Sequence, residues 1–371
     1  MRPLTVVQLL PALEVGGAER SALEIAAALV AAGHRAIVVS AGGRMVRELQ
    51  ALGGEHVELA IGRKSLLTLR HARTLRDLFR QTRADIVHAR SRMPAWVALA
   101  ALRGMKNPPH LVTTVHGLNS PGRYSAVLTR GQRVICVSQT VRAYVLRQWP
   151  DTDAGKLAVI PRGIDPTAFA PNAPFDPTWR DRLLTEHPQL AGSPVLLLPA
   201  RGTRRKGHAH ALELLRALRR DGADARMLLA GVAQDGRESY LRQLRAHAAE
   251  LGVANAVAFA PPLANMRAAY ALADLVLQLS EQPESFGRTV LEALCSGRPV
   301  LGWDHGGVGE LLRELQPHGA VGLGDAAALA QRAKALLAAP RPAIALPERY
   351  TLARMQADTL AVYADLTADP R

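Results

Sequence analysis

Cysteine and aromatic residues are scarce in this chain of 371 residues. Its two cysteines, Cys136 and Cys295, cannot form the disulfide framework of a small secreted domain, and the apolar stretch at residues 5–10 is too short for a signal peptide. We therefore expect a reducing, cytoplasmic compartment. With 4% aromatic residues, the chain has little to stack on single-stranded bases. No apolar run approaches the roughly 20 residues that span a bilayer, so a membrane role would be peripheral.

Acidic residues are in the minority, since 46 Lys and Arg outnumber 32 Asp and Glu and give a net charge of +14. The basic residues are 41 Arg and 5 Lys, which indicates in part a genomic composition bias. Their distribution is more informative: residues 1–160 carry 22 basic and 10 acidic side chains, whereas residues 161–371 carry 24 and 22. This asymmetry favours an anionic partner for the first half, namely nucleic acid, acidic lipid or a phosphorylated substrate.

Short runs rich in Val, Leu and Ile alternate with longer amphipathic segments, the pattern of a parallel sheet covered by helices. The fold class is therefore α/β, with two Rossmann-like, doubly wound domains whose site lies at the carboxyl ends of the strands. The expected strands are Thr5–Leu10, Ala36–Ser40, Asp85–His88, Leu111–Val115, Arg133–Val137 and Leu157–Pro161, then Val195–Leu198, Arg226–Ala230, Ala256–Ala260, Leu275–Leu279 and Val300–Trp303. Seven prolines between residues 161 and 194 predict a hinge with a short irregular excursion.

Three segments at strand ends carry candidate anion-binding groups. Gly16-Gly17 precedes a helix, where backbone amides can approach a diphosphate, although a plain tight turn explains the pair equally well. Arg201 and Lys206-Gly207 follow a strand and can neutralise a leaving diphosphate; the alternative is a solvated basic loop.

The third segment, residues 284–292, is the most specific. Its two carboxylates, Glu284 and Glu292, flank an exposed helix N-terminus formed by the amides of residues 285–288. With this spacing, one carboxylate can hydrogen bond to a sugar, the amides can bind phosphates, and the other carboxylate can hydrogen bond to a ribose. Charge compensation at the helix end for Glu284, and a surface position for Glu292, are the alternatives.

No spacing of carboxylates and histidines predicts a metal site. The segment Asp151-Thr152-Asp153 has the D-x-D form of metal-dependent sugar transferases, but it lies in a turn far from the other motifs. His116 follows a strand and precedes Gly117, where a cleft residue is expected; a structural histidine is the alternative.

Five motifs together resemble, in order and spacing, the retaining glycosyltransferases of family four, which have the GT-B fold of two Rossmann-like domains facing a cleft. The resemblance spans nearly the whole chain and is greatest to bacterial lipopolysaccharide core glycosyltransferases. The motifs are Gly16-Gly17, His116-Gly117, residues 159–165, residues 201–207 and the pair Glu284 and Glu292. The resemblance divides the chain into an acceptor-binding domain (1–165) and a nucleotide-sugar domain (166–349), with the final helix, about 350–371, packing back on the first domain.

The resemblance also implies roles for individual residues. Arg201 and Lys206 would hold the diphosphate, Glu292 the ribose and Glu284 the donor sugar, with His116 near the transferred sugar. The catalytic candidates are His116, Glu284, Arg201 and Lys206. The donor-binding candidates are Gly16, Gly17, Arg201, Lys206, Glu284, Ser285, Phe286, Gly287, Arg288 and Glu292. The donor is expected to be a UDP sugar, with GDP and ADP open, and neither a metal nor another cofactor is expected.

Two positions depart from the family's pattern: Ala200 replaces a common glycine, and Arg162 replaces a common asparagine. Neither touches the expected chemistry directly. Whether Glu284 attacks the anomeric carbon or positions the sugar is not decided by the residues.

Segment 70–83 carries a basic stripe. At 100° per residue, Arg73, Arg76, Arg80 and Arg83 fall in one sector, next to an apolar sector of Leu67, Leu75, Leu78 and Phe79. A helix that buries its apolar face accounts for the second sector, while the stripe suits an anionic membrane or a phosphorylated glycolipid. Arg90 and Arg92, just past a strand, can meet acceptor phosphates.

The resemblance implies a metal-independent, retaining hexosyltransferase. Together with the basic first half, it favours lipopolysaccharide core oligosaccharide as acceptor, an anionic glycolipid at the inner face of the cytoplasmic membrane. The alternatives are exopolysaccharide or phosphatidylinositol mannosyl-type transfer, a nucleotide-sugar 2-epimerase, and a nucleic-acid-binding protein. The last would explain the charge but would leave the glutamate pair and the diphosphate loop unused, so no nucleic-acid partner is expected.

Overall fold

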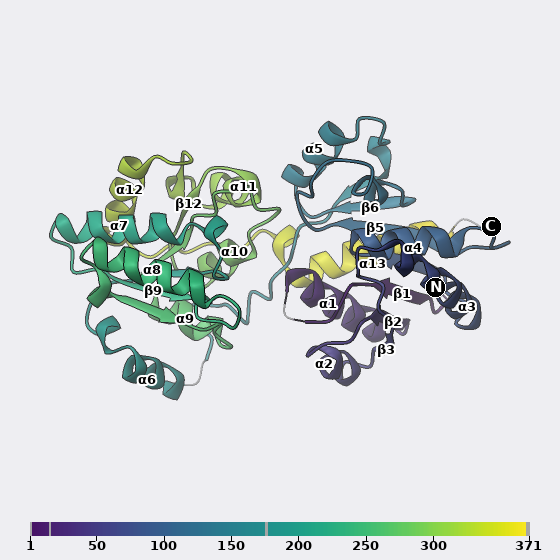
Figure 1. Ribbon diagram of the computed structural model, residues 1–371, viewed down its shortest axis with the longest axis horizontal. Coiled ribbons are helices and arrows are strands. Elements are labelled where there is room, and N and C mark those ends of the chain that lie inside the picture. Colours follow the sequence, from purple (N-terminus) through teal and green to yellow (C-terminus); the bar gives the residue numbers. More distant parts are fainter. Residues whose placement is uncertain (1, 15, 175–176, 369–371) are drawn as a thin grey trace. The chain divides into compact units, whose positions relative to one another are not determined.

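The chain forms two compact units, each built on a parallel sheet with helices on both faces (Figure 1). The computed structural model describes residues 2–14, 16–174 and 177–368. Unit 1 comprises residues 1–163 and 348–371, and unit 2 comprises residues 164–347. From sequence, the first domain is expected to end at residue 165 and the second at residue 349.

Unit 1 contains a seven-stranded sheet in the order β3-β2-β1-β4-β5-β6-β7, with every pairing parallel. Its strands are β1 (Thr5–Leu9), β2 (Arg35–Ser40), β3 (Glu55–Glu58), β4 (Ile86–Ala89), β5 (His110–Val115), β6 (Arg133–Cys136) and β7 (Leu157–Val159). Its helices are α1 (Gly17–Ala31), α2 (Val46–Ala51), α3 (His71–Gln81), α4 (Arg92–Leu102), α5 (Gln139–Gln148) and α13 (Leu352–Ala368), with the 3₁₀ turns η1 (Leu66–Arg70), η2 (Ala126–Thr129), η3 (Ala154–Lys156) and η8 (Glu348–Tyr350).

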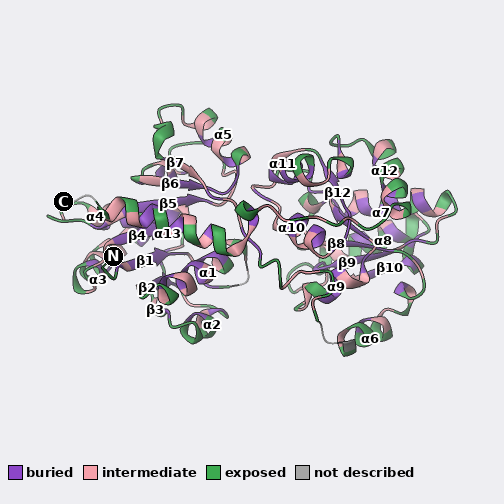
Figure 2. Ribbon diagram, turned by 180° about the vertical axis from the view of Figure 1, so that it is seen from behind, coloured by how far each residue is buried: buried purple, intermediate pink, exposed green. Residues whose placement is uncertain are grey.

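Strand β1 lies inside this sheet, between β2 and β4, and its apolar side chains are fully buried (Figure 2). The C-terminal helix α13 belongs to unit 1 and packs against α1. Gln356 donates to the carbonyl oxygen of Glu24 at 2.8 Å, and Met355 and Tyr363 lie in the same buried cluster as Leu23. The last helix of the chain therefore completes the core of the first unit.

Unit 2 contains a six-stranded parallel sheet in the order β10-β9-β8-β11-β12-β13. Its strands are β8 (Val195–Pro199), β9 (Arg226–Ala230), β10 (Val257–Ala260), β11 (Leu275–Gln278), β12 (Val300–Trp303) and β13 (Ala320–Val321). Its helices are α6 (Pro177–Glu186), α7 (His208–Arg220), α8 (Glu238–Glu250), α9 (Met266–Leu272), α10 (Arg288–Cys295), α11 (Gly306–Leu315) and α12 (Ala326–Ala338), with the 3₁₀ turns η4 (Pro188–Leu190), η5 (Arg204–Lys206), η6 (Ala254–Ala256) and η7 (Pro317–Gly319).

The expected fold class and every expected strand are confirmed, with shifts of a residue or two at the ends. Two strands were not expected: β3, whose sequence is Glu-His-Val-Glu, and the two-residue β13. Both are short edge strands, so neither shows an apolar run. The proline-rich segment contains the helix α6, which begins at Pro177; proline is well tolerated in the first turn of a helix.

The basic segment differs from the expected single helix. Helix α3 begins only at His71, after the 3₁₀ turn η1. Leu75 and Phe79 are buried as expected, but Leu67 is 73% exposed. The 3₁₀ turn changes the angular spacing, which moves Leu67 out of the apolar sector of α3.

The contact between α13 and the sheet generates a stability prediction. The hydroxyl of Tyr363 hydrogen bonds to Nδ1 of His88 at 2.6 Å, and both side chains are buried. Tyr363→Phe leaves a polar atom of His88 buried without a partner, which we expect to destabilise unit 1 by about 1–3 kcal/mol. Urea unfolding of the full chain, followed through the unit 1 transition, measures the change.

Tyr124→Phe is the matched control, because its hydroxyl makes no hydrogen bond with the described residues. An unchanged unit 1 transition in Tyr363→Phe would show that the buried hydrogen bond does not hold α13 in place.

Candidate functional site

The central feature of unit 2 is an ion pair at the carboxyl ends of β8 and β11. The Lys206 ammonium contacts Oε1 of Glu284, and the side chains are 26% and 29% exposed. The Ser280 hydroxyl donates to the same carboxylate oxygen at 2.5 Å. The side chain of Arg201 is exposed and makes no hydrogen bond or ion pair with the described residues, although its charge acts on Glu284. The structure thus brings together three of the predicted residues, Lys206, Glu284 and Arg201.

The surroundings of Glu284 keep its carboxylate charged. Burial by itself raises the pKa of this carboxyl, because water no longer solvates the charge. The charge and hydrogen bond of Lys206, the Ser280 hydroxyl and the charge of Arg201 outweigh burial, so the pKa lies below its ordinary value. Glu284 is therefore ionised at neutral pH. Its contribution to stability is present above the ordinary carboxyl pKa and is lost as the pH falls through the lowered pKa.

Backbone contacts fix the two loops that carry the pair. The amide of Glu281 donates to the carbonyl of Arg205 at 2.9 Å. Gly207 has φ +73°, and a Cβ there would lie 1.9 Å from the carbonyl oxygen of Leu279. A side chain at residue 207 would therefore separate the loops. The glycine after Lys206 lets the cation reach the carboxylate on the neighbouring strand end.

A third loop, residues 304–307, supports Glu284 and was missed by the sequence analysis. The Gly307 amide donates to the carbonyl of Glu284 at 2.7 Å, and Nε2 of His305 hydrogen bonds to the carbonyl of Ser280 at 2.8 Å. A Cβ on Gly306 would lie 2.6 Å from the Glu284 carbonyl oxygen. The available signal was the Gly-Gly pair that follows the strand at 300–303.

Glu292 lies within α10, and its carboxylate contacts side chains from α9 and from its own helix. The Tyr270 hydroxyl donates to Oε2 of Glu292 at 2.8 Å, and Nε of Arg288 lies 3.3 Å from Oε1. Burial and the adjacent carboxylate raise the pKa of Tyr270, so the hydroxyl remains a donor. The side chain of Glu292 is 16% exposed, and its carboxylate is therefore oriented rather than loosely solvated.

The predicted loop between the carboxylates enters α10 through Gly287, with φ +127°. Phe286 is 6% exposed and packs its backbone against Gly307. Ser285 and Arg288 lie on the same loop and first turn. Residues 285–287 therefore form a loop rather than the expected helix end, and the N-terminus of α10 follows Glu284 by four residues.

In unit 1, Gly16 caps α1 and Gly17 begins it. A Cβ on Gly17 would meet nothing within 4 Å, so packing does not require a glycine there. At Gly16 a Cβ would approach the carboxylate of Glu19, which lies against the N-terminal end of its own helix. The backbone at Gly17 is open to close approach by another molecule.

His116 follows β5 and is held by Arg162. The Arg162 guanidinium donates to Nδ1 of His116 and to the Ser21 hydroxyl, each at 2.5 Å. Because a guanidinium only donates, Nδ1 must carry a lone pair and the ring proton is assigned to Nε2. Burial and then the charges of Arg162 and Arg90 hold the pKa of His116 well below its ordinary value. His116 is therefore a neutral Nε2–H donor at physiological pH.

The residues predicted to meet acceptor phosphates are already engaged within unit 1. Arg90 is 3% exposed and donates to Gln8 at 2.7 Å and to Ser21 at 3.2 Å. Arg92 donates to Ser125 at 3.3 Å and lies over the ring of Tyr124. These contacts make Arg90 part of the buried network below His116 rather than a surface cation.

The predicted basic stripe is also divided. Arg76 donates to the carbonyls of Ala100, Ala101 and Arg103 at the end of α4, with distances of 2.8–3.2 Å. Arg80 lies 3.7 Å from Asp77. Arg73 and Arg83 are exposed and make no side-chain hydrogen bond or ion pair with the described residues. One of the four arginines is thus a helix cap, which sequence periodicity could not reveal.

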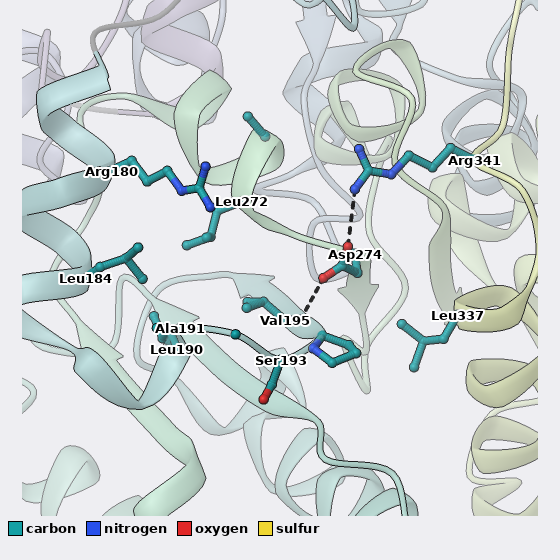
Figure 3. A pocket seen from close by; sticks show the side chains of 13 residues that line it. Arg180, Leu184, Leu190, Ala191, Ser193, Val195, Leu272, Asp274, Leu337 and Arg341 are labelled. Atoms are coloured by element: carbon teal, nitrogen blue, oxygen red, sulfur yellow. Dashed lines mark hydrogen bonds and ion pairs between the residues drawn. The ribbon is translucent and has the colours of Figure 1, made fainter.

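A cavity of about 630 Å³ lies at the opposite end of the unit 2 sheet (Figure 3). Asp274 accepts from the Val195 amide at 2.9 Å and from Arg341 at 3.3 Å, and Arg180 also lines the cavity. Because Val195 begins β8 whereas Arg201 and Lys206 follow it, this cavity is separate from the ion-pair site.

No group of three His, Cys, Asp or Glu residues in the described part of the chain is placed to hold a metal ion. Among residues 2–14, 16–174 and 177–368, no helix is both long enough and apolar enough to span a membrane.

Two family models match the chain. The model described as Glycosyltransferase Family 4 matches residues 15–168, and the model described as Glycosyl transferases group 1 matches residues 181–351. A D-inositol 3-phosphate glycosyltransferase of Xylanimonas cellulosilytica is 34% identical over 158 residues, which cover 42% of this chain and 37% of the relative. The match thus spans little more than a third of that relative's length.

Several solved structures align with nearly the whole of this chain. A glycosyltransferase from Rickettsia africae aligns with TM-score 0.85 and 24% identity over 100% of both chains. Anabaena HepE in complex with UDP and glucose aligns with TM-score 0.76 and 20% identity, over 98% of this chain and 100% of that chain. WaaG, a glycosyltransferase involved in lipopolysaccharide biosynthesis, aligns with TM-score 0.69 and 16% identity over the same shares. These likenesses confirm the expected GT-B fold.

Because Arg162 contacts His116, we expect its removal to change the pKa of this histidine. Arg162→Met removes one positive charge and the hydrogen bond at Nδ1, so the pKa of His116 rises, while burial keeps it below the ordinary histidine value. A titration of the histidine ring signals by NMR, assigned with His116→Gln, measures the shift.

Arg142→Met is the control, because this arginine is not among the groups that shift the His116 pKa. If the His116 signal titrated identically in Arg162→Met and in the unsubstituted protein, Arg162 would not set the charge state of this histidine.

Proposed function

We propose that this chain, which has the GT-B fold and matches both family models, is a glycosyltransferase that moves a hexose from a nucleotide-diphosphate sugar to a phosphorylated acceptor. The observation that carries this proposal is the Lys206–Glu284 ion pair, whose carboxylate residue precedes the N-terminus of α10 by four residues. It places a cation for a diphosphate, amides for phosphate oxygens and a carboxylate for sugar hydroxyls within one loop cluster.

The ion pair suggests how donor binding prepares the site. A diphosphate competes with Glu284 for the Lys206 ammonium, and Arg201 and the α10 amides add to its attraction. Once Lys206 turns to the diphosphate, the Glu284 carboxylate is free to accept from sugar hydroxyls. Binding of the nucleotide portion would thereby expose the group that positions the sugar.

The ribose and the transferred sugar of the donor would be bound by different side chains. Glu292, oriented by Tyr270 and Arg288, accepts from the ribose hydroxyls. Glu284 accepts from the hydroxyls of the sugar, and in unit 1 the neutral N–H of His116 is suited to donate to a sugar hydroxyl. The structures of HepE, which hold UDP or UDP-glucose, support a UDP sugar as donor.

We propose that the cations supply the main catalytic effect. Negative charge develops on the diphosphate as the bond to the anomeric carbon breaks, and Lys206 and Arg201 stabilise that charge. A protein cation at this position performs the task without a metal ion. The sugar retains its anomeric configuration, with Glu284 acting on the donor sugar.

For the acceptor we favour the phosphorylated core of lipopolysaccharide at the inner face of the cytoplasmic membrane. The excess of 22 basic over 10 acidic residues in 1–160 supports an anionic acceptor, and the likeness to WaaG supports this kind of glycolipid. The second candidate is a soluble inositol phosphate, favoured by the name of the sequence relatives.

The test is transfer from UDP-, GDP- and ADP-hexoses, with EDTA present, to three acceptors: lipopolysaccharide core, the same core after phosphatase treatment, and inositol 3-phosphate. We expect transfer from the UDP sugar to the intact core, reduced about tenfold or more after phosphatase treatment, because each lost charge-assisted hydrogen bond weakens binding by about 1.5–3 kcal/mol.

Lys206→Met is the inactive reference, and NMR of the product gives the anomeric configuration. Transfer to inositol 3-phosphate alone would replace the favoured acceptor with the second candidate. The absence of transfer from every donor, in a folded sample, would contradict the proposed activity.

A further inference from the structure

Unit 1 exposes an apolar patch that the fold does not explain. Leu66 and Leu67, in the 3₁₀ turn η1, are 85% and 73% exposed, and Trp96 on α4 is 36% exposed. Leucines this exposed and adjacent to a surface tryptophan are typical of an interaction surface. We call Leu66, Leu67, Leu69, Met93 and Trp96 the apolar patch.

Two hollows meet at this patch. One, of about 480 Å³, is lined by Leu66, Leu69, Met93 and Trp96, and the second, of about 600 Å³, shares Leu69 and Trp96. Elements α3 and α4, which follow η1 in the chain, lie side by side here (Figure 1). Four of the five patch residues therefore share one indented surface, and Leu67 adjoins it as the neighbour of Leu66 in η1.

The rim of the patch is cationic. Lys64 and Arg123 line the first hollow, and Arg103 and Arg130 line the second. No carboxylate lines either hollow. These four residues form the cationic rim, and each of them is exposed.

Trp96 has both an apolar face and a polar anchor, and Tyr124 lies beside it. The indole N–H of Trp96 donates to the carbonyl of Tyr124 at 3.1 Å, and the Lys64 ammonium lies 5.0 Å from the centre of the Tyr124 ring. Tryptophan and tyrosine beside lysine and arginine are characteristic of the boundary between lipid headgroups and acyl chains.

We propose that the apolar patch and the cationic rim dock unit 1 on an anionic phospholipid surface. Leu66 and Leu67 enter the acyl boundary, Trp96 lies at headgroup depth, and the rim meets lipid phosphates. This docking surface rests on the proposed function, because it would bring unit 1 to an acceptor that is embedded in a membrane. A second copy of the chain is disfavoured as occupant, because a twofold contact would place the cationic rims against each other.

The surface differs from the predicted arginine stripe. Arg76 caps α4 and Arg80 lies beside Asp77, so part of that stripe is engaged within the protein. The apolar patch begins before α3, at a turn that helical periodicity assigns to the buried sector.

The experiment is co-sedimentation of the full chain with vesicles of phosphatidylcholine and with vesicles of phosphatidylcholine and phosphatidylglycerol, without donor or acceptor. We expect binding to the anionic vesicles, weakened by salt. Leu66→Ser and Leu67→Ser should each weaken the partition by about tenfold, and Lys64→Ala and Arg123→Ala by about fivefold each.

The matched controls lie in unit 2. Leu323→Ser removes a leucine that is 54% exposed, and Arg216→Ala removes an exposed arginine of α7; neither should change the partition. Quenching of tryptophan fluorescence by brominated lipid, lost in Trp96→Phe, gives a local readout of the same contact.

Three results would overturn the proposal: no binding to anionic vesicles, equal binding of the Leu66→Ser/Leu67→Ser protein, or a concentration-dependent dimer abolished by that double substitution while vesicle binding persists. Vesicle binding is measured without turnover, so its failure is distinct from failure of the transferase. With a detergent-dispersed acceptor, the double variant should keep the activity of the unsubstituted protein.

Discussion

The contact between Lys206 and Glu284 is the interaction on which the account depends. It joins two residues that lie 78 positions apart in the chain and that follow the neighbouring strands β8 and β11. Because the strands run parallel, their carboxyl ends meet at one edge, and the loops that leave them are brought together. The ion pair therefore holds side by side a cation that can bind a diphosphate and a carboxylate that can accept from sugar hydroxyls.

Unit 1 carries a second polar cluster, in which Arg162 and the buried Arg90 lie close enough to His116 to lower its pKa. Burial and then the charge of Arg162 keep the ring neutral, Arg162 donates to its Nδ1, and Arg90 donates to Gln8 and Ser21. These contacts determine which nitrogen of the His116 ring can donate a hydrogen bond, because Nδ1 accepts from Arg162 and Nε2 carries the proton. The arginine at residue 162, where the family's pattern has asparagine, therefore contacts a predicted site residue, His116.

The sequence predicts the fold well, because buried parallel strands are short apolar runs. It misses β3 and β13, since edge strands of two to four residues carry no such run. It identifies Lys206 and Glu284 by their positions after strands. It does not reveal the Tyr270 partner of Glu292 or the support from residues 305–307, because these contacts depend on how separate loops pack. The exposure of Leu67 depends on a 3₁₀ turn that helical periodicity does not detect.

The central claim is that the loop cluster around Lys206 and Glu284 binds a nucleoside diphosphate. The most direct measurement is thermal unfolding with UDP, GDP and ADP in the presence of EDTA. A ligand at about 100 times its Kd adds about 2.7 kcal/mol, which corresponds to a rise of a few degrees in Tm. The account predicts this rise with UDP, its loss in Lys206→Met and its retention in the unit 2 control Arg216→Met. No rise with any nucleotide, or an equal rise in Lys206→Met, would contradict it.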